Sequence, residues 1–154
     1  MIIRNSAKGI IIRGNKLLVV ELENNGRYYT LPGGKQEPNE LMLDALKREM
    51  LEETGYDVNP IELLFIRETF EEDGETHRVE FMVLCEIVAE VSDNKFQYDE
   101  YQVGTKWINN DNISEEPLYP VELRKLIKNF YLGKRGDVYQ GVMNQRSVSF
   151  GGQI

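Results

Sequence analysis

Apolar and β-branched residues near the start of the chain fall in short runs separated by turn residues. The runs Ala7–Arg13 and Lys16–Glu23 flank Gly-Asn at residues 14–15, which is the pattern of two strands around a tight turn. A second turn, Asn-Asn-Gly at residues 24–26, precedes Arg27–Thr30, where we expect a short strand. The first part of the chain is therefore predicted to form β-sheet.

A helical pattern comes after these strands. Leu-Pro-Gly-Gly at residues 31–34 interrupts regular structure. Asn39 is the expected N-cap, and Glu40–Thr54 is rich in strong helix formers and holds no proline or glycine. This pattern predicts a helix of about four turns. Gly55 is expected to end it in the left-handed conformation.

The second half of the chain alternates strands with polar connections. An acidic hairpin loop is expected at residues 71–75 and a polar loop at Ser92–Gly104. Pro120–Tyr131 predicts a second helix, because proline is favoured at a helix start and glycine, here Gly133, after its end. The tail at residues 136–154 carries only weak structural signals. Three further strands are expected, at Ile61–Arg67, Arg78–Val91 and Lys106–Ile108.

Composition limits the classes of protein and of site. A chain of 154 residues with 41% hydrophobic residues, no repeat and no linker suits one globular domain over residues 1–154. One cysteine, Cys85, excludes an intramolecular disulfide, and one histidine, His77, excludes zinc sites built on paired histidines.

Charge and hydropathy bear on partners and compartment. The net charge is −8 and the basic residues are scattered, which argues against a nucleic-acid partner or an anionic membrane partner. No apolar run approaches the roughly 18 residues that a membrane-spanning helix needs, and residues 1–20 lack a signal-peptide pattern. We therefore expect a soluble cytoplasmic protein with a reduced thiol.

Three glutamates gather on one face of the predicted helix. At about 100° per residue, Glu52 and Glu53 lie within about 60° of Glu49, and one or two turns earlier the same face is apolar. These charges lie in the last two turns, where the helix dipole disfavours each by about 0.3–1 kcal/mol. Arg48 can offset one of them, as the i,i+4 partner of Glu52. A bound hard cation would offset the rest, and oxygen-only ligation favours Mg²⁺ or Mn²⁺ over zinc.

These residues belong to a longer pattern. Gly34, Glu40 and the run Arg-Glu-Met-Leu-Glu-Glu-Thr-Gly-Tyr at residues 48–56 match every specified position of the Nudix box, G-x5-E-x7-R-E-U-x-E-E-x-G-U, in which U is bulky and apolar. Leu-Pro-Gly-Gly before the box and Trp107 after it agree with the same family. The chain resembles the Nudix hydrolases over most of its length.

The resemblance implies an α/β (α+β) Nudix fold, with a mixed β-sheet sandwiched between α-helices. It implies Mg²⁺-dependent hydrolysis, with Mn²⁺ as the alternative ion, of a small-molecule nucleoside diphosphate linked to a group X. Arg48 would orient the glutamate side chains, Glu40 would tie the loop to the helix, and one glutamate, often Glu49, would act as the base in some members. The metal ligands that it implies are the Gly33 carbonyl and the carboxylates of Glu49, Glu52 and Glu53.

Family members usually add an acidic residue from a later loop. Glu100, seven residues before Trp107, is our candidate for this catalytic and metal-binding role, and a solvated loop glutamate is the alternative. Glu80 and Glu68 are the next candidates.

Substrate choice lies outside the box. The proline and the tyrosine that mark ADP-ribose and dinucleoside polyphosphate hydrolases past the box are missing, which leaves a nucleoside triphosphate pyrophosphohydrolase as the default. An ADP-ribose or nucleotide-sugar pyrophosphatase and a nucleotide sensor without turnover stay open, as does a homodimer. An isoprenyl diphosphate isomerase would need a cysteine near the Gly-rich turn, whereas Cys85 lies far along the chain.

Overall fold

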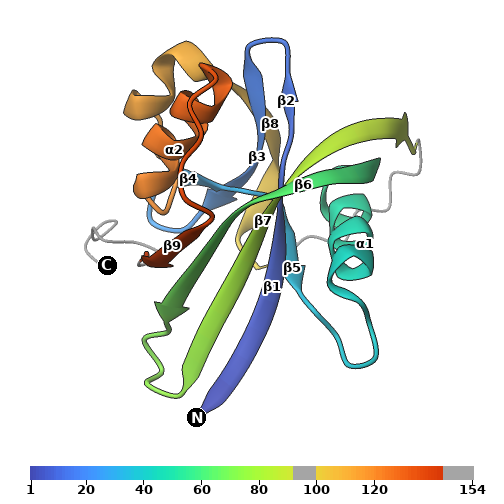
Figure 1. Cartoon of the computed structure of the whole chain (residues 1–154), viewed down its shortest axis with the longest axis vertical. Helices are drawn as coiled ribbons and strands as arrows, with labels where there is room; N and C mark the ends of the chain where they lie inside the picture. Colours follow the sequence, from blue (N-terminus) through green and yellow to red (C-terminus); the bar gives the residue numbers. More distant parts are fainter. Residues whose placement is uncertain (92–99, 144–154) are drawn as a thin grey trace.

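The computed structural model describes residues 1–91 and 100–143, which form two β-sheets and the helices around them (Figure 1). The strands are β1 (Ile2–Ile10), β2 (Ile12–Arg13), β3 (Lys16–Glu23), β4 (Arg27–Thr30), β5 (Gly33–Lys35), β6 (Tyr56–Phe70), β7 (Thr76–Glu90), β8 (Gln102–Asn109) and β9 (Tyr139–Val142). The helices are α1 (Met42–Thr54), the 3-10 helix η1 (Asn110–Glu115) and α2 (Glu122–Tyr131). No helix in this part of the chain is long and apolar enough to cross a membrane.

The larger sheet is mixed, as expected. Its strand order is β5-β1-β7-β6-β9; β1 runs parallel to β7, β9 runs parallel to β6, and the other pairs are antiparallel. In the smaller sheet β3 pairs with β2, β4 and β8. Helix α1 lies on one side of the larger sheet and α2 on the other (Figure 1). The predicted class, a mixed sheet between helices, is confirmed.

The two faces of the larger sheet bury separate cores. Leu46 and Met50 of α1 pack against one face, which contains Ala7 and the buried Cys85 thiol. Burial raises the pKa of this thiol to about 12, in keeping with a packing role. Gly9 lets α1 approach closely, because a Cβ there would lie 2.9 Å from the Met50 sulfur. The close contact sets the position of the acidic face of α1 relative to β1.

Two helix starts differ from the prediction. Helix α1 begins at Met42 with Leu41 as N-cap, not at Glu40 after Asn39. Asn39 has φ 66°, a left-handed turn conformation that asparagine tolerates and that an N-cap does not adopt. Helix α2 begins after Val121 instead of at Pro120. The predicted left-handed end of α1 at Gly55 is confirmed, with φ 77°.

Several strands are longer than their sequence patterns suggest. Strand β6 starts at Tyr56, directly after α1, because its backbone pairs with β7 almost to the helix. Strand β1 extends back to Ile2 beside β7 for the same reason. The tail also contains a strand, β9, which pairs with β6. Residues 144–154 of the predicted tail and residues 92–99 of the predicted loop lie outside the described residues.

Candidate active site

The Gly33 peptide connects the edge strand β5 to the acidic face of α1. Gly33 has φ 137°, and a Cβ on it would lie 2.1 Å from the Ala7 carbonyl oxygen, so only glycine fits here. Its N–H donates a hydrogen bond to Glu53 Oε1 at 2.9 Å. Glu53 is only 3% exposed, which is unusual for a carboxylate and places it inside the molecule, as the helical spacing predicts.

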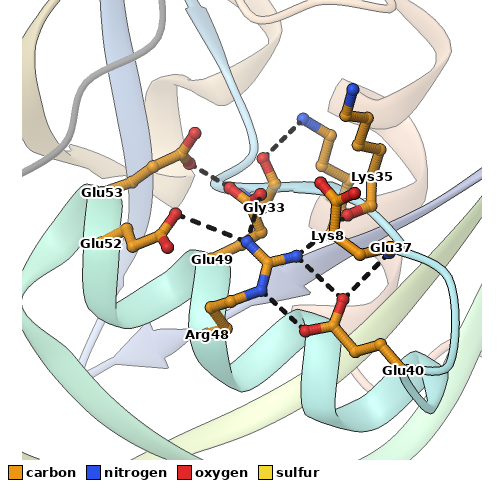
Figure 2. Close-up of polar contacts among 9 residues, drawn as sticks. All are labelled: Lys8, Gly33, Lys35, Glu37, Glu40, Arg48, Glu49, Glu52 and Glu53. Carbon is orange, nitrogen blue, oxygen red and sulfur yellow. Dashed lines mark hydrogen bonds and ion pairs between the residues drawn. The ribbon is translucent and has the colours of Figure 1, made fainter.

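Gly34 leaves room for a second carboxylate. A Cβ on Gly34 would lie 2.5–2.7 Å from the carboxylate atoms of Glu49, so this carboxylate occupies the space that any other residue would fill. The two consecutive glycines thus allow two glutamates, one turn apart on α1, to lie directly against the backbone of β5. Figure 2 shows Glu49 and Glu53 both directed toward this strand.

Arg48 organises the remaining polar contacts. Its guanidinium donates to both carboxylate oxygens of Glu40, at 2.7 and 2.9 Å, and to Glu49 Oε1 at 3.0 Å (Figure 2). It also lies 3.5 Å from Glu52 Oε2 and donates to the Lys35 carbonyl at 3.2 Å. The ion pair with Arg48, together with the Glu37 N–H, lowers the pKa of the Glu40 carboxyl to about 2. Glu40 therefore ties the loop to the helix, as the resemblance implies.

The site has more negative charge than its own cation balances. Arg48 forms ion pairs with three carboxylates, those of Glu40, Glu49 and Glu52, and the Gly33 N–H binds a fourth, that of Glu53. The carboxylates and the Gly33 carbonyl form an oxygen-only donor set, which suits a hard divalent cation. Across residues 1–91 and 100–143, no three acidic, histidine or cysteine side chains surround a common metal position. Arg48 attracts Glu49 and Glu52, while the Gly33 N–H holds Glu53.

The loop candidate Glu100 does not join the contacts that the described residues make in this cluster. Its side chain is exposed, in a turn just before β8. Two residues later, the Gln102 side chain donates to the Glu53 carbonyl at 3.4 Å, which brings the start of β8 to the C-terminal end of α1. The hydrogen bonds of the described residues leave the Glu100 carboxylate outside the cluster.

The other two acidic candidates have different partners. Glu80 is 4% exposed and pairs with the buried Arg67 at 2.8 Å. Glu68 accepts a hydrogen bond from Tyr139 and lies 2.6 Å from the His77 ring. Neither carboxylate joins the α1 cluster, since both are committed to partners on the larger sheet.

Lys8, which no sequence pattern singled out, reaches the same loop. Its ammonium donates to the Gly33 carbonyl, the expected metal ligand, at 3.3 Å. In the sequence, Lys8 is a charged residue within an otherwise apolar run. Only the pairing of β1 with β5 shows that it lies beside Gly33.

The chain is similar to known proteins over most of its length. The model of the NUDIX domain matches residues 3–130. A NUDIX hydrolase from Nitrosomonas europaea has a TM-score of 0.72 and 26% identity, over 86% of this chain and 90% of that one. An ADP-ribose pyrophosphatase from Streptococcus suis has a TM-score of 0.62 and 20% identity, over 90% and 97%.

One curated relative shares a shorter stretch. The 8-oxo-dGDP phosphatase NUDT18 of Danio rerio is 43% identical over 65 residues, and the match covers 39% of this chain and 20% of the relative. The chain thus matches only a fifth of that protein's length. The family-wide match is broader, and it surrounds a loop and helix that carry every specified residue of the box. On these grounds, the chain belongs to the Nudix hydrolase family.

Proposed function

We propose that this protein is a divalent-metal-dependent pyrophosphohydrolase that cleaves a nucleoside diphosphate derivative by attack of water. Nudix hydrolases generally use divalent metal cations and act on small molecules of this class. The observation that carries the proposal is the buried Glu53 carboxylate, which the Gly33 N–H binds beside the Glu49 carboxylate against Gly34. A cluster with this excess of negative charge is complementary to a cation and not to a bare anionic substrate.

In this proposal Glu49, Glu52, Glu53 and the Gly33 carbonyl hold Mg²⁺, with Mn²⁺ as the alternative. The bound ion would neutralise the diphosphate and lower the pKa of the attacking water. Arg48 orients Glu49 and Glu52 from one side while the Gly33 N–H orients Glu53 from the other. Glu100, exposed at the end of the loop before β8, is the proposed additional ligand or base.

The substrate is proposed as a class. The similar proteins are named for 8-oxo-dGDP, ADP-ribose and, in a structure that is 20% identical with a TM-score of 0.66, UDP-X. These names share a nucleoside diphosphate and differ in the base and in the group attached beyond the second phosphate. A nucleoside triphosphate is our default substrate, and the alternatives are ADP-ribose, nucleotide sugars and an oxidised purine nucleotide.

A substrate panel with a matched variant tests the proposal. Nucleoside triphosphates, 8-oxo-dGDP, ADP-ribose and UDP-sugars are incubated with the protein and Mg²⁺ or Mn²⁺, and products are separated by anion-exchange chromatography. We expect metal-dependent release of a nucleoside monophosphate from at least one class, lost with EDTA and in Glu53→Gln. If the folded protein released no product from any nucleotide of the panel, the proposed enzymatic activity would be contradicted. Nucleotide binding without product release would favour a sensor.

A further inference from the structure

Lys8 and Glu53 contact opposite ends of the same residue. The Gly33 N–H donates to Glu53 at 2.9 Å, and the Gly33 carbonyl accepts from the Lys8 ammonium at 3.3 Å. The backbone pairing of β1 with β5 places Lys8 beside Gly33. Gly33 therefore separates the positive charge of Lys8 from the α1 carboxylates that are proposed to hold the metal.

The hydrogen-bond acceptor of Lys8 is neutral, which leaves its charge uncompensated by a direct partner. Among the described residues, no carboxylate lies within 4.0 Å of this ammonium. An ammonium has three donors, and the Gly33 carbonyl uses one of them. Lys8 as a whole is half-buried. An ammonium in this state is an anion-binding group.

The buried acid Glu80 does not form an ion pair with Lys8. Glu80 accepts its hydrogen bond from Arg67, at 2.8 Å, and Arg67 also donates to the Met143 carbonyl at 2.6 Å. Burial by itself raises the pKa of the Glu80 carboxyl, but the charges of Arg67 and Lys8 bring it below its ordinary value. Glu80 thus attracts Lys8 at longer range and favours its position without forming a contact pair.

The Lys8 side chain is directed away from the carboxylates of α1 (Figure 2). In Figure 2 the Lys8 side chain extends away from α1, and Lys35 on the adjacent strand extends the same way. A cavity of about 10 Å³, with room for a single water molecule, adjoins Lys8 and is lined by Thr30, Leu31, the Arg67–Glu80 pair, Tyr119, Pro120 and Leu123. The carboxylates and the ammonium therefore flank the Gly33 peptide with opposite charges.

We propose that Lys8 binds a phosphate oxygen of the substrate, adjacent to the metal that the α1 carboxylates hold. The inference rests on the proposed function. When substrate binds, the Lys8 ammonium gives up its hydrogen bond to the neutral Gly33 carbonyl and donates to an anionic phosphate oxygen, which is a stronger acceptor. Lys8 thereby sets which phosphate lies over the carboxylates, and so which anhydride bond is attacked. It also leaves the Gly33 carbonyl available when substrate arrives.

Lys8→Met, which removes the charge and keeps most of the side-chain length, should have two opposite effects. Binding of a methylene-bridged nucleoside triphosphate in the presence of Mn²⁺ should weaken by about 10- to 100-fold, the scale of a lost hydrogen bond to a charged group. Binding of Mn²⁺ without nucleotide should stay equal or tighten, because a nearby positive charge is gone. Calorimetry measures both.

Two further variants separate charge from folding. Lys8→Arg keeps the charge and should recover most of the nucleotide affinity, whereas Lys16→Met, at the exposed start of β3, should behave as wild type. Steady-state kinetics of Lys8→Met should show a larger rise in KM than fall in kcat. These readouts would not move in this way if Lys8 only supported the fold.

Three results would overturn the inference. Unchanged analogue binding in Lys8→Met, with an active wild type, would reject the role of Lys8 and leave the proposed function intact. Parallel loss of analogue binding, Mn²⁺ binding and thermal stability would assign Lys8 to the fold. A wild type that neither binds nor cleaves any nucleotide of the panel would reject both proposals together.

Discussion

The ion pair on the larger sheet and the ion-pair cluster on α1 differ in their balance of guanidinium and carboxylate charges. On the sheet, Arg67 and Glu80 form a one-to-one pair, both almost fully buried, and Arg67 has the Met143 carbonyl as a further acceptor. On α1, a single half-exposed Arg48 contacts Glu40, Glu49 and Glu52, while Glu53 is bound by a backbone N–H.

This difference in charge balance distinguishes an ion pair that stabilises the fold from a cluster that is suited to bind a ligand. A buried pair whose charges cancel is complete as it stands, and removal of either partner leaves a stranded charge. A cluster with surplus carboxylates stores repulsion that a cation can relieve, at some cost to the fold without it. We infer that the sheet pair holds the structure together while the α1 cluster is shaped for a ligand.

The largest expected effect comes from breaking the matched pair. Arg67→Met should lower the free energy of unfolding by about 3–5 kcal/mol, because Glu80 is then buried without its partner. The double variant Arg67→Met/Glu80→Gln should recover part of this loss, since the stranded charge is gone. Urea denaturation followed by circular dichroism measures each value. A loss under about 1 kcal/mol in the single variant would contradict the comparison.

Breaking the unmatched cluster should instead affect activity. Glu53→Gln should lower kcat by about 100- to 1000-fold, the scale of losing one charge-stabilising group at a reaction centre. The apo protein should remain as stable or gain stability, because one repelling charge at a helix C-terminus is removed. Mg²⁺ should raise the melting temperature of wild type more than that of the variant. Equal metal-induced shifts would remove Glu53 from the metal site.

Glu100 tests whether the acidic cluster extends to the opposing loop. We expect Glu100→Gln to lower kcat by at least about 10-fold while Mn²⁺ binding without substrate changes little, since its exposed carboxylate would join only when substrate is held. Asp99→Asn, at the preceding residue, is the matched control and should retain activity. Near-normal turnover in Glu100→Gln would mean that the additional acidic group lies elsewhere.

The smallest expected effect is a pH dependence of the Glu40–Arg48 pair. The pKa of the Glu40 carboxyl is lowered to about 2 from an ordinary 4.5, so its ionised form stabilises the fold. The contribution is complete above pH 4.5 and disappears as the pH falls toward 2. The melting temperatures of wild type and Glu40→Gln should therefore differ at neutral pH and converge below pH 4.5. A difference that does not depend on pH would assign Glu40 a packing role.

Local patterns in the sequence were reliable where local physics decides the outcome. The spacing of apolar and acidic residues predicts the core of α1 and a shared face of Glu49, Glu52 and Glu53. The structure places Glu49 and Glu53 against β5 and Glu52 beside Arg48. The start of α1 was wrong because Asn39 adopts a left-handed turn, a choice set by the loop and not by its preference for N-caps. Strand ends were also wrong, because pairing with neighbours extends β1 and β6.

The sequence by itself determined the helix, its acidic face and the two glycines beside it, since helical periodicity and glycine's freedom act over a few residues. Only the tertiary structure decided which charges are matched. Lys8 reaches Gly33 because β1 pairs with β5 across 25 residues of chain, and Arg67 reaches the Met143 carbonyl across 76. Such contacts depend on strand register, which the packing of the whole sheet sets and no local pattern encodes.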